Sequence, residues 1–271
     1  STYMGRKINV GIILTLTLFL ILGLIFYYPI FLGQVPFNGN LLAAFWSPWK
    51  YQSFEGFSIG GVPFKFVAVD EIREFYPLLD FNYNLLRSGT IPLWNPYNFS
   101  GYPNLANWAS AVFYPLHIVL FLLNKIQFFI FLKVSAIVLS GFFTYLYLLA
   151  LKLDRKAAFF GGITFAFSAT LLVWGAEIWQ AVHAVIWLPL ILLSIEKTIF
   201  TRNSSYVVLG GFGLAASIMA GYIQPTIYIL ITIFTYSLFR LLPFPFSFSK
   251  IPIRTVLSIV FIIVLGIGLS A

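Results

Sequence analysis

"QFFIFLKVSAIVLSGFFTYLYLLAL" (residues 127–151) is the stretch that decides the fold class of this chain. Lys133 is its one charged residue. A helix needs about 20 apolar residues to cross a bilayer, so this stretch is long enough to span one. Because apolar and polar residues do not alternate in it, a membrane-barrel strand is disfavoured. The stretch therefore predicts a transmembrane helix.

The composition of the whole chain agrees with this prediction. Hydrophobic residues make up 60% of the 271 residues and charged residues 9%, and the mean hydropathy is +0.94. Soluble domains carry roughly 25% charged residues. We therefore predict an all-α polytopic membrane protein. The chain has no cysteine, which excludes disulfides and thiolate chemistry. We assign the net charge of +8 to cytoplasmic loops rather than to nucleic-acid binding.

Similar apolar runs recur along the sequence, and seven of them are predicted to span the membrane. A further run at 109–124 is short and contains Pro115 and His117. If this run crossed the bilayer, the basic loop around Arg155 would face outside, against the positive-inside rule. We therefore expect it to lie in the interface or to re-enter. The predicted spans are about 8–28, 127–151, 157–174, 181–199, 206–220, 222–240 and 253–271.

This topology separates the charges by compartment. Ten basic residues and two acids then fall on one side, while residues 29–126 carry five of each. The rule that basic loops stay inside predicts a cytoplasmic N-terminus and a large outer loop over 29–126. The first run lacks a small-residue cleavage site, so we expect an anchor. We interpret residues 1–271 as a single domain, the front part of a longer protein.

An acidic cluster lies in the predicted outer loop, in "VAVDEIREFYPLL" (residues 67–79). Three of the eight acids in the chain, Asp70, Glu71 and Glu74, stand there beside Arg73. Residues 70–88 are predicted to form an amphipathic helix that Gly89 caps. Pro77 would kink this helix or move its start to about residue 76. The apolar positions repeat at three- and four-residue steps: Ile72, Tyr76, Leu79, Tyr83 and Leu86.

The cluster has two interpretations on residue types alone. A carboxylate in a partly desolvated cleft can act as a general base or hold a divalent cation. The alternative is a solvated helix start in which Arg73 pairs with the acids. Adjacent side chains diverge on a helix, so Asp70 and Glu71 would share one ligand only on an irregular backbone.

Two further residues lie at predicted helix ends on the outer side. His183 forms a stripe with Glu177 and Gln180 if its helix begins that early. It then either faces a cavity or sits in an aromatic belt. Lys133 either snorkels outward or holds a lipid-linked phosphate together with Lys125 or Arg73.

The stretch "DEIREFYPLLDFNYNLLRSGTIPLWNPYNFSGYPNLANWASAVFYPLH" (residues 70–117) resembles the first outer loop of the bacterial YfhO-like membrane proteins. These belong to the GT-C superfamily of integral-membrane glycosyltransferases. "HAVIWLPLILLSIEK" and "IMAGYIQPTIY" follow in the expected order, so the resemblance extends from about residue 35 over nearly the whole chain.

The resemblance implies a GT-C-like bundle whose outer loop carries helices lying along the membrane. It implies transfer of a sugar from a polyprenyl-phosphate carrier to a cell-envelope glycopolymer or lipid acceptor. This would take place on the outer face of the bacterial cytoplasmic membrane. The catalytic acid of the superfamily maps to Asp70, with Glu71 beside it. A divalent cation is the one cofactor left open.

Substrate binding is assigned on the same basis. Lys133, Lys125 or Arg73 would neutralise the donor phosphate. His183 and Gln224 would line the sugar site, and Trp94 would stack on a sugar or anchor the loop in the interface. Two other functions compete with glycosyl transfer. They are transport of a lipid-linked glycan and a non-catalytic assembly role on the same fold.

Overall fold

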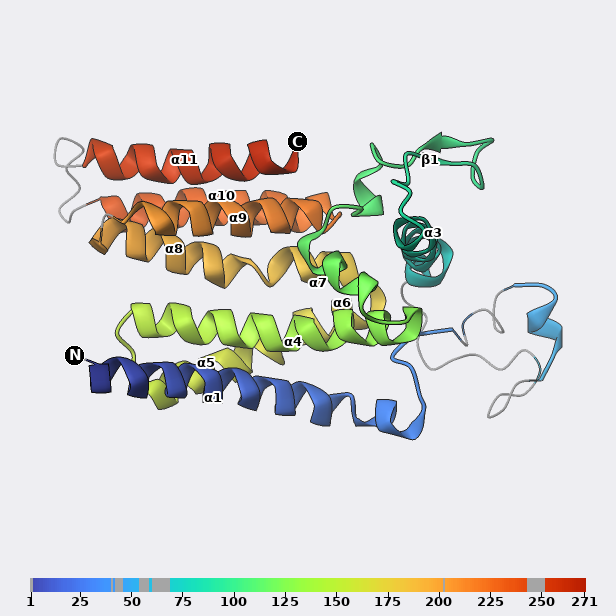
Figure 1. Cartoon of the computed structure of the whole chain (residues 1–271), viewed down its shortest axis with the longest axis horizontal. Helices are drawn as coiled ribbons and strands as arrows, with labels where there is room; N and C mark the ends of the chain where they lie inside the picture. Colours follow the sequence, from blue (N-terminus) through green and yellow to red (C-terminus); the bar gives the residue numbers. More distant parts are fainter. Residues whose placement is uncertain are drawn as a thin grey trace.

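The protein is a bundle of long helices with several short elements gathered at one end (Figure 1). The computed structural model describes residues 2–39, 41, 46–53, 59, 69–201, 203–242 and 252–271. The helices of the bundle are α1 (Thr2–Phe26), α4 (Lys125–Ala150), α5 (Arg155–Ala166), α6 (Ala169–Glu177), α7 (Trp179–Val185), α8 (Leu188–Thr201), α9 (Ser204–Met219), α10 (Ile223–Leu241) and α11 (Ile253–Ser270).

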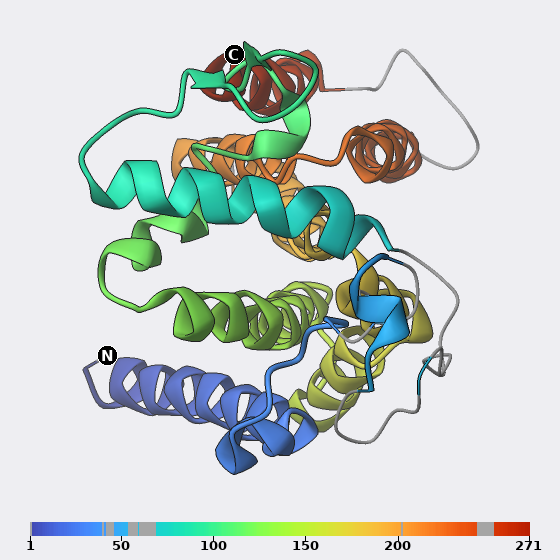
Figure 2. The ribbon, with the colours of Figure 1, turned by 90° about the vertical axis from the view of Figure 1, so that its right-hand side faces the viewer.

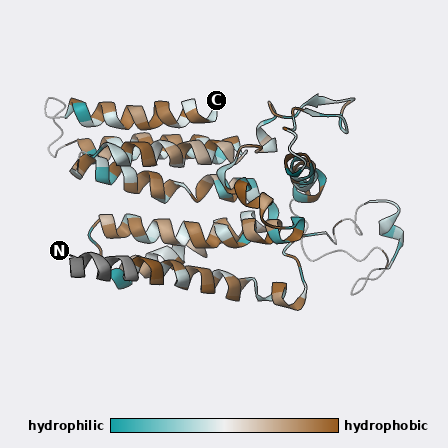
Figure 3. Cartoon of the chain, in the orientation of Figure 1, coloured by the Kyte–Doolittle hydropathy of each residue, from teal (hydrophilic) through white to brown (hydrophobic). Residues whose placement is uncertain are grey.

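Four described helical segments are long and apolar enough to cross a membrane: Lys125–Ala150, Arg155–Glu177, Trp179–Thr201 and Ile253–Ser270. Figure 3 shows apolar residues along the long helices, while hydrophilic residues gather mainly near the helix ends and in the segments beyond them. These features fit an all-α membrane protein. Three of the seven predicted spans, about 8–28, 206–220 and 222–240, are not among these four segments of the described chain.

Two of the predicted spans are broken helices. The run 157–174 divides into α5 and α6, where Ser168 accepts a hydrogen bond from the Leu171 N–H and begins a new helix. The run 181–199 divides into α7 and α8, and Pro189 lies in the first turn of α8, where its missing N–H costs no helical hydrogen bond. Between these pairs, Ile178 is extended (φ −140°, ψ 93°) and ends α6.

Small residues let the helices of the bundle approach closely. A Cβ atom at Gly162 would lie 2.7 Å from the Gly141 carbonyl oxygen and from the Phe19 ring. This contact joins α5, α4 and α1. A Cβ atom at Gly266 of α11 would lie 2.7 Å from Leu214 of α9. The helix contacts are therefore set by backbone proximity as well as by apolar side chains.

The short elements between α1 and α4 lie together at one end of the bundle, here called the loop end. Helix α3 (Tyr76–Arg87) runs across the long helices, so it is seen end-on in Figure 1 and lengthwise in Figure 2. The other elements are the 3-10 turns η1 (Tyr28–Leu32), η2 (Trp49–Tyr51), η4 (Trp108–Ser110) and η5 (Pro115–Phe121), the π-helical turn η3 (Glu71–Phe75), and the strands β1 (Trp94–Asn95) and β2 (Tyr102–Pro103).

The amphipathic helix predicted over 70–88 is confirmed in its apolar face and corrected at its start. The α-helix begins at Tyr76, with Pro77 in its first turn, as the second alternative for Pro77 required. Leu79 and Tyr83 are buried against the bundle. Gly89 follows with a left-handed φ of +79°, as expected of the residue just past a helix.

Buried amides fasten the rest of the loop end to α3. The Asn82 side chain donates to the Ser110 carbonyl (2.7 Å), and Asn104 donates to the Asn82 side-chain oxygen (2.9 Å) and to the Pro92 carbonyl (3.0 Å). Strands β1 and β2 pair antiparallel, Trp94 with Pro103. The run 109–124 forms 3-10 turns rather than a membrane-length helix, in line with the prediction that it does not span.

Candidate functional site

Asp70 lies on the surface at the start of residues 70–75, here called the acidic turn. Its Oδ1 accepts a hydrogen bond from the Arg73 guanidinium at 2.8 Å, and the two side chains are 39% and 63% exposed. The pairing predicted for a charge-balanced helix start is therefore present at Asp70. Solvent reaches both groups, so a second molecule can reach them too.

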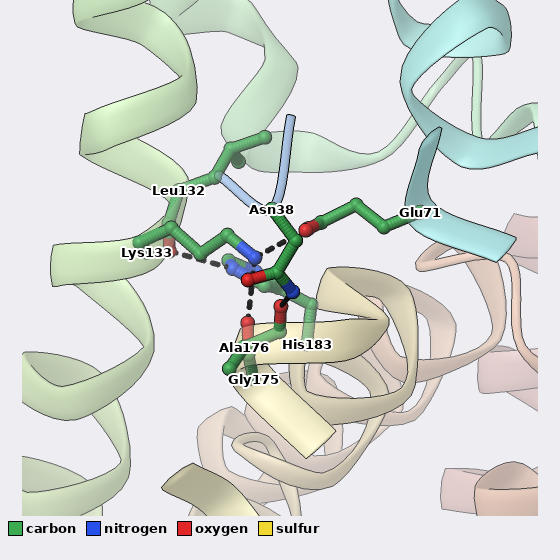
Figure 4. Close-up of polar contacts among 7 residues, drawn as sticks. All are labelled: Asn38, Glu71, Leu132, Lys133, Gly175, Ala176 and His183. Carbon is green, nitrogen blue, oxygen red and sulfur yellow. Dashed lines mark hydrogen bonds and ion pairs between the residues drawn. The ribbon is translucent and has the colours of Figure 1, made fainter. Parts of the chain in front are cut away.

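Glu71, the next residue, points in the opposite direction. Its side chain is fully buried and forms an ion pair with Lys133 of α4, whose side chain is 2% exposed (Figure 4). The prediction that Lys133 snorkels outward is wrong, because an acid from the loop end meets it inside the protein. The expected divergence of the two side chains is thus confirmed. The Asp70 carboxylate lies on the protein surface, and the Glu71 carboxylate lies in the protein interior.

Lys133 also donates a hydrogen bond to a backbone carbonyl at the C-terminal end of α6. Its Nζ donates to the Gly175 carbonyl at 2.6 Å, and Asn38 donates to the next carbonyl, Ala176, at 3.0 Å. Both carbonyls belong to the last turn of α6, where backbone acceptors have no partner within the helix. A cation near the C-terminal end of a helix is favourable. Lys133 therefore joins η3, α4 and α6 at one point (Figure 4).

Burial raises the pKa of Glu71 from 4.5 to about 7. The nearby Lys133 charge and its hydrogen bond act in the opposite direction, and the Glu177 carboxylate adds to the increase. Desolvation outweighs the attraction of one lysine because a charged carboxylate loses its water shell on burial. The Glu71 carboxyl therefore titrates near neutral pH.

His183 is buried, and both of its ring nitrogens have partners. Nε2 lies 2.9 Å from the Leu132 carbonyl oxygen and Nδ1 lies 2.7 Å from the Tyr114 hydroxyl. A carbonyl oxygen can only accept, so Nε2 carries hydrogen, and in the neutral imidazole Nδ1 then accepts from Tyr114. The Trp187 indole N–H donates to the same hydroxyl at 3.2 Å. In this arrangement neither nitrogen of His183 is open to a sugar.

The predicted stripe of Glu177, Gln180 and His183 does not exist as one helix face. Glu177 ends α6, Ile178 is extended, and the other two residues lie on α7. All three side chains are nevertheless buried, at 1% exposure each. The three-residue spacing would place these side chains on one face only if a single helix continued through residue 178.

The remaining predicted site residues are spread over the loop end. Lys125, the first residue of α4, forms an ion pair with Asp80 of α3, and both side chains are 35% exposed. Gln224 is exposed at the start of α10 and donates to the Tyr228 hydroxyl at 2.8 Å. Trp94 is 55% exposed, and its indole lies over Gly101. Glu71 takes no part in these hydrogen bonds and ion pairs.

An apolar cavity of about 270 Å³ lies between α6, α7 and α10. Tyr222 lies at the start of α10 on the cavity wall, and its ring is 6.3 Å from that of Phe75, the last residue of η3. The cavity thus begins beside the acidic turn. Its lining includes Leu171, Trp174, Val182, Val185, Leu188, Tyr222, Gln224 and Ile229.

Sequence reasoning missed the cavity and the partner of Lys133. A single lysine in a long apolar run usually pairs with an acidic residue. The position of Lys133 could therefore have been used to predict a buried ion pair. The cavity left no comparable signal, since its lining residues are ordinary for membrane helices. Within the described residues, no group of three or more His, Asp or Glu side chains is placed to hold a metal ion.

No protein-family model, curated protein or solved structure matches the chain, so a function for it rests on its own residues.

Proposed function

We propose that the protein is a glycosyltransferase that moves a sugar from a polyprenyl-phosphate carrier to a cell-envelope acceptor on the extracytoplasmic face. One observation carries the proposal. The acidic turn presents an exposed carboxylate, Asp70, at the end of a bundle of membrane-length helices, and the last residue of that turn contacts the wall of an apolar cavity. The resemblance to the GT-C superfamily supports the same function.

Asp70 is assigned as the general base. It accepts the proton of an acceptor hydroxyl while the hydroxyl oxygen forms a bond to the anomeric carbon of the donor sugar. The bond between that carbon and the phosphate oxygen breaks, and its electron pair leaves with the polyprenyl phosphate. Of the two carboxylates, Asp70 is the exposed one and Glu71 is buried, so an acceptor can approach Asp70 alone.

The donor would bind with its charged and apolar parts in different places. Arg73 and Lys125 are accessible cations at the loop end and suit the leaving phosphate. The apolar cavity suits the first isoprene units, with Gln224 near its mouth and Trp94 available to stack on sugar. Lys133 and His183 are not assigned to the substrate, because both are buried and hydrogen-bonded.

The proposal includes a seven-span topology in the bacterial cytoplasmic membrane, with a cytoplasmic N-terminus and the loop end outside. The absence of cysteine makes this topology testable with single-cysteine variants. Ser53→Cys at the loop end and Lys152→Cys in the turn between α4 and α5 are both exposed sites. A membrane-impermeant maleimide added to intact cells should label the first variant and spare the second. Labelling of both, or the reverse pattern, would contradict this topology.

The test of function compares the wild type with Asp70→Asn in a strain that lacks the protein. Cells or membranes receive polyprenyl-phosphate-linked glucose, mannose, galactose or N-acetylglucosamine, each radiolabelled in the sugar, and the label in envelope polymers is counted. Loss of the base should lower transfer by about a hundredfold or more. The exposed neighbour Glu74→Gln is the matched control and should retain transfer.

A non-catalytic assembly role is the second candidate. It is favoured by one observation, that Lys133 and His183, two of the residues expected to bind substrate, are buried and hydrogen-bonded within the protein. Full transfer by Asp70→Asn would exclude Asp70 as the base. No transfer by the wild type with any of the four donors would favour the assembly role.

A further inference from the structure

We propose that Lys133 and Glu71 are positioning residues, which hold the acidic turn in the one arrangement that turns Asp70 outward. This inference rests on the proposed function for its catalytic consequence, and on the geometry of the turn for the rest. Lys133 comes from α4 and Glu71 from η3, so the pair joins the loop end to the helix bundle.

The backbone of the turn explains why a side-chain anchor is needed. Glu71–Phe75 is a π-helical turn in which the Tyr76 N–H donates to the Glu71 carbonyl, five residues back. π-helical turns are rare and occur mostly as single turns, frequently at functional sites. Without an anchor, an α-helical register would rotate residues 70 and 71 relative to the bundle. The buried Glu71 side chain holds residue 71 toward the bundle, and Asp70, the residue before it, then lies at the surface.

The energetics favour a positioning role over a purely stabilising one. Taking both charges out of water costs several kcal/mol, and an apolar pair of similar volume is often at least as stable. A buried ion pair does, however, strongly disfavour arrangements in which one charge loses its partner. Lys133 makes the arrangement more restrictive, because its second hydrogen bond goes to the Gly175 carbonyl.

A second ion pair in the same region provides the matched control. Lys125 and Asp80 link the first residue of α4 to α3, but each side chain is 35% exposed. Such a pair contributes little, because water and salt screen it. Removing it with Asp80→Asn should leave the acidic turn unchanged.

The first readout is independent of transferase activity. Asp70→Cys introduces the one thiol of this chain, and its rate of reaction with a membrane-impermeant maleimide reports how the turn presents residue 70. In the full chain in native membranes, adding Lys133→Met should change this rate by about tenfold, as expected for a lost buried anchor. Adding Asp80→Asn should leave the rate within about twofold.

A double variant keeps the test decisive if Lys133→Met alone fails to fold. Glu71→Gln combined with Lys133→Met removes both charges of the pair together, so neither is left buried without the other, and this variant should fold better than Lys133→Met alone. The rate at residue 70 should still change in this background. An unchanged rate in the folded double variant would overturn the inference, whatever the outcome for glycosyl transfer.

The second readout is kinetic and applies to the chain with Asp70 in place. Lys133→Met should lower kcat by about tenfold and raise the KM for the donor by a smaller factor, because Asp70 and Arg73 lie on the displaced turn while Lys125 and the apolar cavity do not. Loss of transfer in Asp70→Asn with full kcat in Lys133→Met would leave the proposed function standing and remove this inference. Absence of transfer in the wild type would remove the proposed function, and the thiol rate would still decide the geometry.

Discussion

The Lys133 ammonium donates a hydrogen bond to the Glu71 carboxylate inside the protein, although 62 residues separate the two in sequence. The lysine belongs to a membrane-length helix and the acid to the loop end. Their contact therefore ties the loop end to the bundle through one buried carboxyl group.

The stability of the fold should fall as the pH rises from 4.5 to above 7. The pKa of Glu71 is about 7 in the folded chain and near 4.5 when unfolded, so the folded state binds more protons in this window. The stabilisation is complete below pH 4.5 and is lost as the pH passes through 7, by at most roughly 3 kcal/mol. Thermal unfolding in detergent across this range measures it.

Glu71→Gln is the control for that measurement, because it keeps the shape and a hydrogen-bonding oxygen but cannot ionise. The pH dependence of its melting temperature should be flatter than that of the wild type in the same window. Parallel curves for the two proteins would show that Glu71 is not the group responsible.

Gly162→Ala should destabilise the protein through the contact of α5 with α4. The added Cβ would lie 2.7 Å from the Gly141 carbonyl oxygen, and backbone atoms cannot move aside as a flexible side chain can. Overpacking of this kind costs about 1–3 kcal/mol. Gly268→Ala on α11 is the matched control, since nothing lies within 4 Å of its Cβ position. Equal melting temperatures for the two variants would rule out this close contact.

The positions of the long helices could be predicted from the sequence, because a long apolar run can be recognised from its residue types alone. It also predicted the buried face of α3, since Leu79 and Tyr83 follow the helical repeat. The breaks inside the spans were missed, although Ser168 and Pro189 are ordinary signals for a helix start. In each case apolar residues continue across the break, so hydropathy hides it.

The site was predicted in part. That the acids of residues 70–74 lie together in the segment between the first two long helices could be inferred, but which of two adjacent acids is buried could not. That depends on the π-helical register of residues 71–75, which no residue pattern specifies. The burial of Lys133 likewise depends on Glu71, a partner that is distant in the sequence. The sequence predicted that His183 lines a sugar site, but in the fold its Nδ1 is hydrogen-bonded to the Tyr114 hydroxyl.

Tyr114→Phe should destabilise the core around His183 without changing its volume. The Tyr114 hydroxyl donates to His183 Nδ1 and accepts from the Trp187 indole, so its removal leaves two buried polar groups without this partner. An unsatisfied buried group costs about 1–3 kcal/mol. Tyr228→Phe is the comparison, because that hydroxyl is exposed and bonds the exposed Gln224. Thermal unfolding should rank Tyr114→Phe well below Tyr228→Phe, and equal losses would contradict the network.

The last prediction concerns the buried carboxylate of Glu196, near the end of α8 away from the loop end. Arg240 donates to it through Nε (2.5 Å) and Nη2 (2.7 Å), and the Tyr236 hydroxyl also donates. Glu196 is 1% exposed and Arg240 is 30% exposed. Removing the arginine therefore leaves the Glu196 carboxylate buried without its cation, where water cannot reach it.

Arg240→Met alone should therefore destabilise the protein more than Glu196→Gln combined with Arg240→Met. A double-mutant cycle, measured by chemical unfolding in detergent, should give a coupling of about 1–3 kcal/mol. The same cycle on the pair of Lys125 and Asp80, each 35% exposed, should give less than about 1 kcal/mol, because solvent screens it. Equal couplings for the two pairs would mean that burial of Glu196 does not govern its energetics. A larger coupling at Glu196 would mark the contact between α8 and α10 as charge-dependent.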